Sequence, residues 1–165
     1  MKYKLTKKYI ENLGVKLFQI QAVTDFGCIS KGDLGGYIQS EQCLSQSGNA
    51  WVYDNAWVYG DARVSGNARV YDNARVSDDA QVYGDARVYG DARVSGNARV
   101  SDDARVSDDA QVYGNARVYD NAQVYSDAQV YGNAQVYGNA RVYGNAQVYS
   151  RAQVSGNAQV YTKAG

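Results

Sequence analysis

One residue type recurs with a strict period over about two thirds of the chain. Valine occupies every sixth position from Val52 to Val160, and alanine stands two positions before each of these valines. Residues two apart in an extended chain point to the same side. Alanine and valine must therefore face one way, and the residue between them, arginine or glutamine in most repeats, must face the other. A fixed period without insertions requires identical short segments that stack on one another.

The residues between successive Ala-x-Val segments are those that form tight turns. Most of these positions carry Gly-Asn, Gly-Asp, Asp-Asn or Asp-Asp pairs. Glycine, asparagine and aspartate tolerate the left-handed backbone conformation better than other residues, so each pair is expected to form a corner. Short strands that alternate with corners make the chain coil, and inward-facing side chains then stack from coil to coil. The pattern predicts an all-β, parallel solenoid.

The six-residue unit resembles the repeat of the hexapeptide-repeat proteins. In Val52 and Ala56, as in every later unit, an aliphatic residue is followed four positions later by a small one. The resemblance covers residues 50–161 and implies a left-handed parallel β-helix, a triangular solenoid in which three hexads make one coil. Nineteen such units give six to seven coils, a rod about 30 Å long at about 4.8 Å per coil. The handedness comes from the resemblance alone, because general rules of strand connection favour the right hand.

The chain divides into two parts. Residues 1–33 are expected to form a small N-terminal β cap, and residues 34–165 are expected to form the β-helix. In the cap, "KYKLT" and "VKLFQIQAV" alternate polar and apolar residues as strands do. Cys28, Leu34, Ile38 and Leu44 fall in register with the inward-facing positions and are predicted to be buried. A cap is needed because the end of a solenoid exposes unpaired strand edges. The C-terminal "QVYTKAG" has no comparable cap, which favours pairing with another copy there.

A second resemblance concerns "AVTDFGCISKGDLGGYIQSEQCLSQSGNAWVYDNA", Ala22–Ala56. Its D-F-x(2-4)-K-G-x-x-G-G-[YWF] block, followed by L-S-Q-x-G, is similar to the N-terminal region of uncharacterised bacterial and prophage hexapeptide-repeat proteins. Some of these proteins are labelled transferases. The resemblance implies a family without an established activity.

The composition excludes several classes of function. The 17 basic and 17 acidic residues balance, so binding to nucleic acid is not expected. No apolar run could span a membrane or serve as a signal peptide, so no membrane association is expected. Two cysteines do not make a disulfide framework. The expected compartment is the cytoplasm, which is the host-cell cytoplasm if the chain is phage-encoded.

Catalysis is disfavoured on three grounds. Hexapeptide-repeat acyltransferases usually activate the acceptor with a histidine, and the related γ-class carbonic anhydrases hold zinc with three histidines. The chain contains no histidine, and no insertion interrupts the hexads to shape a pocket. The Asp-Asp pairs at 78–79, 102–103 and 108–109 fall on three different edges and are expected to be solvated corner residues rather than calcium ligands. We therefore expect no catalytic residues, no metal and no cofactor. A hexapeptide-repeat acyltransferase is the alternative.

Any function must lie in the outward-facing side chains, which return to the same face after every third hexad. One face carries a nearly continuous tyrosine column, with an arginine column beside it. The predicted partner-binding residues are Tyr53, Tyr71, Tyr89, Tyr125, Tyr143, Tyr161, Arg69, Arg87 and Arg105. Tyrosine and arginine are enriched where proteins bind one another. Stacked tyrosine and glutamine also stabilise a solenoid, so the sequence leaves both roles open. Trp51 and Trp57 are expected to pack against the cap.

The sequence thus predicts a non-catalytic protein-interaction or structural module that presents a rigid Tyr/Arg-rich face. The expected partner is a protein. In the sharpest version, the chain is a phage or prophage protein that binds and inhibits a host defence protein. The chain is also expected to form a homo-oligomer, through the Tyr/Arg face or through the C-terminal edge. A self-assembling structural protein without a foreign partner is a further alternative.

Overall fold

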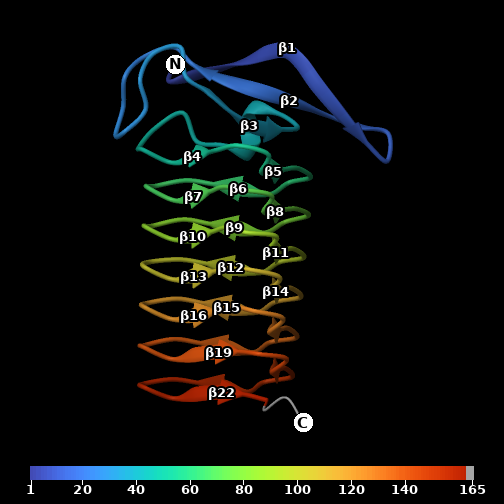
Figure 1. Cartoon of the computed structure of the whole chain (residues 1–165), viewed down its shortest axis with the longest axis vertical. Coiled ribbons are helices and arrows are strands. Elements are labelled where there is room, and N and C mark those ends of the chain that lie inside the picture. The colour runs from blue at the N-terminus through green and yellow to red at the C-terminus, as the bar shows by residue number, and fades with distance from the viewer. Residues whose placement is uncertain (163–165) are drawn as a thin grey trace.

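Each Ala-x-Val segment forms a strand of two or three residues, and the strands stack into a triangular rod (Figure 1). The computed structural model describes residues 1–162. Three sheets, named here by their strand numbers, form the walls of the rod. The seven-stranded sheet contains β4 (Trp51–Val52), β7 (Arg69–Val70), β10 (Arg87–Val88), β13 (Arg105–Val106), β16 (Gln123–Val124), β19 (Arg141–Tyr143) and β22 (Gln159–Tyr161). The six-stranded sheet contains β6 (Arg63–Val64), β9 (Gln81–Val82), β12 (Arg99–Val100), β15 (Arg117–Val118), β18 (Gln135–Val136) and β21 (Gln153–Val154).

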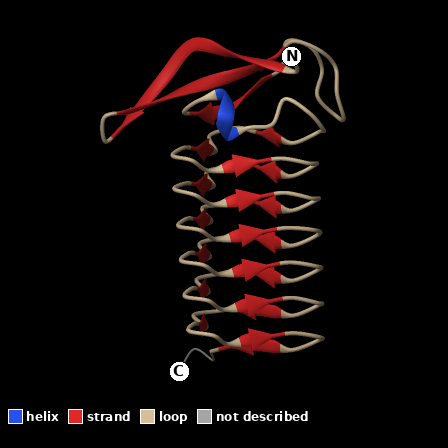
Figure 2. Cartoon of the chain, turned by 180° about the vertical axis from the view of Figure 1, so that it is seen from behind, coloured by secondary structure: helices blue, strands red, loops and turns tan. Residues whose placement is uncertain are grey.

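The nine-stranded sheet joins the rod to the N-terminal cap. Its repeat strands are β5 (Trp57–Val58), β8 (Arg75–Val76), β11 (Arg93–Val94), β14 (Gln111–Val112), β17 (Gln129–Val130) and β20 (Gln147–Val148). Its other strands are β1 (Tyr3–Asn12), β2 (Val15–Ala22) and β3 (Leu34–Ile38). A short 3-10 turn, η1 (Glu41–Cys43), lies between the cap and the coils (Figure 2).

Neighbouring strands of the rod pair in parallel with residues one coil, or three hexads, away. Arg87 of β10 pairs with Arg105 of β13, for example, and Val88 pairs with Val106. In Figure 1 the seven-stranded sheet faces the viewer, and the chain crosses it from left to right before it turns behind at the nine-stranded sheet. Because the coils descend from the cap, this path is left-handed. The predicted left-handed β-helix of about seven coils with an N-terminal β cap is confirmed.

The core consists almost entirely of the repeated alanine and valine side chains. From Ala50 to Val142, all of them are at most 1% exposed. Each coil contributes three valines to the centre, and the alanines allow the walls to approach one another. This burial of apolar surface is the main term that stabilises the rod.

The corner aspartates Asp78, Asp102 and Asp108 are exposed, as predicted, and they also have a structural role. Six aspartates adopt the left-handed backbone conformation at the first corner position: Asp54, Asp72, Asp78, Asp102, Asp108 and Asp120. Each Oδ2 accepts a hydrogen bond from the backbone N–H of the corner one coil further on. Gly90 N donates to Asp72 Oδ2 at 3.0 Å, and Ser126 N donates to Asp108 Oδ2 at 3.0 Å. The side chains therefore satisfy donors that the tight corners would otherwise leave to water.

The cap is an antiparallel hairpin whose sheet continues into the rod. Strand β1 pairs antiparallel with β2, β2 pairs antiparallel with β3, and β3 then pairs in parallel with β5. The strands predicted from "KYKLT" and "VKLFQIQAV" are confirmed as parts of β1 and β2. The proposed division between residues 33 and 34 falls immediately before β3, the strand that belongs to both parts of the sheet.

Two buried polar side chains attach the start of the chain to the first coil. Tyr3 is fully buried and its hydroxyl donates to Leu44 O at 2.7 Å, so burial raises its pKa well above the ordinary range. Lys2 is 6% exposed, and its Nζ donates to Ala50 O at 2.9 Å and lies 4.9 Å from the centre of the Phe26 ring. Burial lowers the pKa of this ammonium group to about 8. Together these contacts cover the N-terminal end of the core.

Two predicted core residues of the cap region are not in the core. Cys28 is exposed and Leu34 is 58% exposed. The repeat register does not extend this far back, because an isolated bridge between Phe26 and Ile29 turns the chain and buries Ile29 instead.

The two tryptophans occupy different positions near the cap. The packing predicted for Trp51 is confirmed, since its ring makes edge contacts with Tyr3 and Phe26. Trp57 pairs with Tyr37 of β3, and its outer side is covered by the Arg75 guanidinium, 4.4 Å from the ring centre. Only Trp51 is therefore part of the buried contact between cap and rod.

The opposite end of the core is open in the described part of the chain. Ala158 is exposed and Val160 is half-buried. A hollow of about 400 Å³ at this end is lined by Val148, Val154 and Val160, among others. The predicted C-terminal edge "QVYTKAG" includes residues 163–165, which lie outside the described residues. Among residues 1–162, no helix is long and apolar enough to cross a membrane.

Candidate protein-binding face

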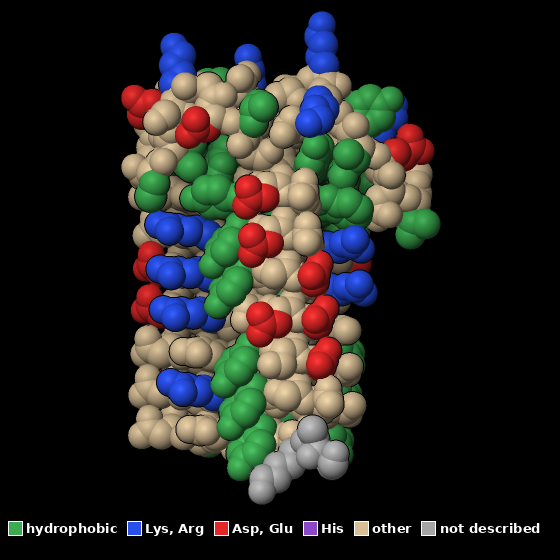
Figure 3. Space-filling view, viewed as in Figure 1, with side chains coloured by type: hydrophobic (Ala, Val, Ile, Leu, Met, Phe, Trp, Pro, Cys, Tyr) green, Lys and Arg blue, Asp and Glu red, His purple; other side chains and the backbone are tan. Residues whose placement is uncertain are grey.

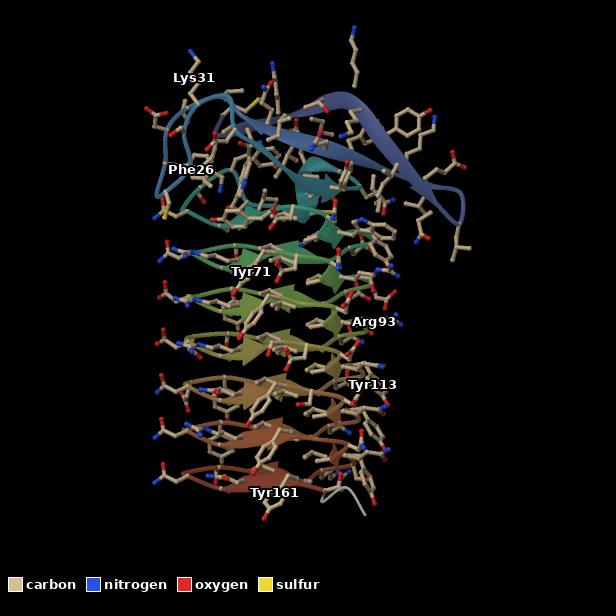
Figure 4. All side chains as sticks on the ribbon, viewed as in Figure 1. Phe26, Lys31, Tyr71, Arg93, Tyr113 and Tyr161 are labelled. Carbon is tan, nitrogen blue, oxygen red and sulfur yellow. The ribbon has the colours of Figure 1, made fainter. Side chains whose placement is uncertain are left out.

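All nine predicted binding residues lie on the outer surface of the seven-stranded sheet. Arg69, Arg87 and Arg105 are direct neighbours in the parallel ladder and form one column. The tyrosines form a second column beside it, two positions further along each coil. Figure 3 shows the arginine column next to the tyrosine column on the face towards the viewer, and Figure 4 places Tyr71 and Tyr161 on this same sheet.

The tyrosine column consists of two separate stacks. Tyr71 and Tyr89 stack with ring centres 4.9 Å apart and planes 2° apart, and Tyr53 meets Tyr71 edge-on. Ser107 interrupts the column and is only 6% exposed. The second stack contains Tyr125, Tyr143 and Tyr161, with ring centres 5.1 Å and 5.0 Å apart. The face therefore carries two aromatic surfaces, separated by a gap at the level of β13, where Ser107 replaces tyrosine.

The residue 16 positions later decides whether a tyrosine hydroxyl is bonded within the rod. Where that residue is glutamine, its Oε1 accepts the hydroxyl across one coil. Five pairs do this, at 3.2 to 3.4 Å: Tyr113–Gln129, Tyr119–Gln135, Tyr131–Gln147, Tyr137–Gln153 and Tyr143–Gln159. Where the residue is arginine, no such bond forms, because a guanidinium has no acceptor atom. The tyrosines of this second group are Tyr53, Tyr59, Tyr71, Tyr83, Tyr89 and Tyr125.

The residue 16 positions later thus separates tyrosines whose hydroxyl is bonded within the rod from tyrosines whose hydroxyl can bond another molecule. The three tyrosines of the first stack all belong to the second group, and the arginines 16 positions later are the three arginines of the predicted site. Within residues 1–162, no ion pair within 4.0 Å engages these guanidinium groups. We call Tyr53, Tyr71, Tyr89, Arg69, Arg87 and Arg105 the Tyr/Arg patch. By contrast, Tyr143 in the second stack is bonded to Gln159.

The surroundings of Tyr53 and Tyr71 favour the protonated hydroxyl, which can donate a hydrogen bond. Partial burial raises the pKa of Tyr53, although the Arg69 guanidinium opposes this shift. Partial burial and the neighbouring Tyr89 raise the pKa of Tyr71, opposed by Arg87. The arginines are exposed, whereas the tyrosine rings are half-buried by their stacking. The patch thus presents flat apolar rings, hydroxyl donors and guanidinium donors on one rigid sheet.

A surface hollow of about 280 Å³ lies at the N-terminal end of the patch. It is lined by Cys28, Tyr53, Asp54, Arg69, Tyr71 and Arg87. Arg69 Nη2 contacts Cys28 Sγ at 3.8 Å, so the cap loop reaches the edge of the patch. The sequence did not place Cys28 here, because the repeat register assigned it to the core and no pattern in the loop indicates otherwise.

Among the described residues, no group of three or more Asp, Glu, Cys or His side chains could hold a metal ion. Asp91, Asp109 and Asp127 form a column, because they are spaced by three hexads. From the sequence we considered only the Asp-Asp pairs and did not identify this column. The three aspartates line a hollow of about 230 Å³ with Arg93, Gln111 and Gln129.

The stacked hexads define the class of this chain, a left-handed β-helix built from hexapeptide repeats. A model of the YdcK β-solenoid repeat matches it at residues 56–70, 62–78, 68–84, 80–96, 92–108, 110–126 and 134–150. These stretches cover more than half of the chain, which therefore belongs to the YdcK β-solenoid repeat family.

A relative from Escherichia coli (strain K12) carries the name "Uncharacterized acetyltransferase YdcK". It is 48% identical to this chain over 40 residues, which are 24% of this chain and 12% of that protein. The match therefore spans about an eighth of the relative's length.

Proposed function

We propose that the chain is a non-catalytic protein-binding module and that the Tyr/Arg patch is its contact surface. The observation that carries this proposal is the division of the tyrosines by their hydrogen bonds. Tyr71 and Tyr89 have no glutamine acceptor, and Arg87 and Arg105 have no carboxylate partner within 4.0 Å among residues 1–162. Exposed guanidinium groups and tyrosine hydroxyls without such internal partners suit contacts with another molecule.

The rigidity of the rod supports the same role. Strands β7, β10 and β13, which carry the arginines of the patch, are each held on both sides by the parallel ladder, and the Tyr71 and Tyr89 rings are held by stacking. Little conformational entropy is lost when such side chains are immobilised by a partner, so more of the contact energy contributes to affinity. Tyrosine and arginine are, together with tryptophan, enriched among the residues that contribute most to binding at protein interfaces.

Replacing Tyr71 and Tyr89 together by serine should weaken partner binding at least about tenfold without unfolding the rod. Serine already occupies this position in other hexads, such as Ser107. A partner is first captured from host lysate with the tagged protein, and its affinity is then measured with purified components.

The matched control replaces Tyr113 and Tyr131, which stack with the same 4.9 Å and 2° geometry on the nine-stranded sheet. Affinity should be unchanged there, although some stability is lost because the hydroxyls of these two tyrosines donate to glutamines. Equal affinity of the wild-type protein and a folded Tyr71/Tyr89 variant would refute the patch as the contact surface.

A finer version of the proposal names the kind of partner. The resemblance of Ala22–Ala56 to prophage proteins supports a partner that is a host defence protein, inhibited by the bound chain. Expression of the chain in bacteria that carry the captured defence protein should then raise the plating efficiency of a restricted phage. The Tyr71→Ser/Tyr89→Ser variant should not have this effect. Equal protection by both proteins would contradict this version.

The name of the E. coli relative favours an acetyltransferase as the second candidate. The chain has no histidine to act as the usual general base, and it matches only 12% of that protein. A ligand that binds the folded state raises the melting temperature, so a thermal-shift series with acetyl-CoA and longer acyl-CoAs separates the two functions. We expect no shift. A concentration-dependent rise in Tm would support the enzyme instead.

A further inference from the structure

We propose that the Tyr/Arg patch binds a second copy of this chain, in a dimer whose two-fold axis runs parallel to the rod. This inference rests on the proposed function, because it names a partner for the same surface. Two observations support it. Charged residues lie on both sides of the tyrosine column, and aspartate at the first corner position occurs in hexads that carry arginine and in none of those with glutamine.

The face has a basic side and an acidic side. The column of Arg69, Arg87 and Arg105 runs along one side of the tyrosines, and acidic corner residues follow the tyrosines on the other. Figure 3 shows the arginines on one side of the aromatic rings, with acidic side chains at the corner beyond them, and further acidic side chains on the other side of the rings. The acidic residues beyond the arginines are Asp85 and Asp103. Those on the other side of the rings are Asp54, Asp72 and Asp108, with Gly90 in the same column. These three carboxylates are exposed.

The acidic side is preorganised. Asp72 Oδ2 accepts from Gly90 N, and Asp108 Oδ2 accepts from Ser126 N, both at 3.0 Å. Each carboxylate is therefore fixed at its corner, and each keeps acceptor capacity on its second oxygen. An incoming guanidinium would meet an oriented acceptor, which favours a charge-assisted hydrogen bond.

A second copy can be placed by a 180° rotation about an axis that runs parallel to the rod in front of the tyrosine column. This rotation exchanges the left and right sides of the face and keeps every coil at the same height. Arg69 of one copy then faces Asp72 of the other, and Arg105 faces Asp108. Each contact occurs twice because a two-fold interface is isologous. At the level between them, Arg87 faces Gly90 of the other copy. Glycine has no side chain there, so the guanidinium can reach the neighbouring Tyr89 ring, where a cation–π contact is favourable.

Arginine and aspartate tend to occur in the same hexad, although no ion pair joins them within the described chain. Aspartate stands at the first corner position in five of the nine hexads with arginine and in none of the eight with glutamine. Arginine and the aspartate three residues later point away from the same strand about 10 Å apart along the chain. Two of the five pairs, Arg69 with Asp72 and Arg105 with Asp108, lie on the seven-stranded sheet. An interface that joins the two sides of this face would use both charges of these pairs.

The spacing favours a second rod over an extended segment of another protein. Neighbouring arginines of the column are about 4.8 Å apart, the distance between paired strands, whereas same-face residues of an extended strand repeat about every 6.6 Å. The acidic side chains of an extended strand that lies along the column would therefore no longer align with the arginines after two contacts. A second copy has the same spacing at every rung.

The six-stranded sheet is the competing face for the same arrangement. It also carries arginine and aspartate on one rung, in Arg99 with Asp102 and Arg117 with Asp120. Its Tyr119, however, donates its hydroxyl to Gln135. The seven-stranded sheet presents three adjacent tyrosines without such a bond, so we assign the interface to that sheet.

Sedimentation velocity with the full chain tests the proposal. At about 100 µM and about 50 mM salt, the wild-type protein should be a dimer that weakens at least about tenfold at about 500 mM salt. Arg69→Glu with Arg105→Glu places like charges opposite each other and should give a monomer. Adding Asp72→Asn and Asp108→Asn removes that repulsion and should restore part of the dimer.

The asparagine substitutions keep the corners intact, because asparagine tolerates the left-handed conformation and retains an acceptor for the backbone N–H. The control is Arg99→Glu with Arg117→Glu on the six-stranded sheet, which should dimerise like the wild-type protein. Circular dichroism establishes that every variant is folded.

Three results would overturn the proposal: a monomeric wild-type protein at low salt, unchanged dimerisation of the folded Arg69/Arg105 variant, or loss of the dimer in the Arg99/Arg117 control alone. Each of them leaves the proposed function testable. A monomeric chain that loses a foreign partner on replacement of Tyr71 and Tyr89 would refute the dimer and retain the binding module.

Discussion

Val94→Asp should destabilise the rod by about 4 kcal/mol or more and unfold several coils at once. Val94 is completely buried and stacks between Val76 and Val112 in the nine-stranded sheet. The neighbouring core side chains are alanine and valine, so the carboxyl group would have no hydrogen-bonding partner. Because each coil is stabilised mainly by its neighbours, loss of one central coil also removes support from the coils on either side. Urea denaturation followed by circular dichroism measures the loss.

Two matched variants separate burial of charge from other effects. Val94→Thr keeps the shape but adds a hydroxyl and should cost about 1 to 2 kcal/mol. Arg93→Asp introduces the same carboxylate one residue earlier on the exposed side and should change stability by about 0.5 kcal/mol or less. Equal stability of the two aspartate variants would mean that the alternation of inward and outward residues is wrong.

Gly36→Val should detach the N-terminal cap, at a cost of about 3 kcal/mol or more. A Cβ atom at Gly36 would lie 2.7 Å from Ala56 O and 2.8 Å from Tyr53 O. Ala56 O cannot retreat easily, because it accepts the hydrogen bond from Tyr37 N that pairs β3 with β5. The coils beyond β5 should stay folded, since their core does not involve the cap.

Hydrogen exchange shows where the change occurs. Amides of β1 and β2 should exchange much faster in the Gly36→Val variant, and fluorescence of Trp51 should shift to longer wavelength as the ring becomes wet. Amides of β11 to β16 should keep their protection. Gly32→Ala is the control, because a Cβ there meets nothing within 4 Å and only the positive φ of 99° is unfavourable. Protection of β1 and β2 equal to that of the wild-type protein would contradict the close contact at Gly36.

The coils could be predicted from the sequence because their structure depends on a local pattern. Each Ala-x-Val segment and its corner repeat the same conformation, so one correct assignment fixes all nineteen. The cap depends on a single, non-repeated turn. The register of the repeat therefore failed at Cys28 and Leu34, where the bridge between Phe26 and Ile29 decides which side chain is buried.

The candidate site was predicted in part for the same reason. The spacing of three hexads placed nine side chains on one face, and the structure has them there. The hydrogen bond from Tyr113 to Gln129 runs diagonally across one coil, and a comparison of residues exactly three hexads apart does not reveal it. Likewise, the role of Asp72 depends on a backbone conformation that the corner composition allows but does not require.

The interior of this rod and its surface have different periods. The interior repeats with every hexad, whereas a side chain returns to the same face only after three hexads. Loss of one hexad would keep every later valine in the core and carry every later surface residue to the next face. Loss of three hexads would shorten the rod and leave the faces as they were. Loss or gain of hexads can thus place the later surface residues on any of the three faces while the interior stays the same. Recombination between repeats can therefore rearrange a binding face without changing the fold.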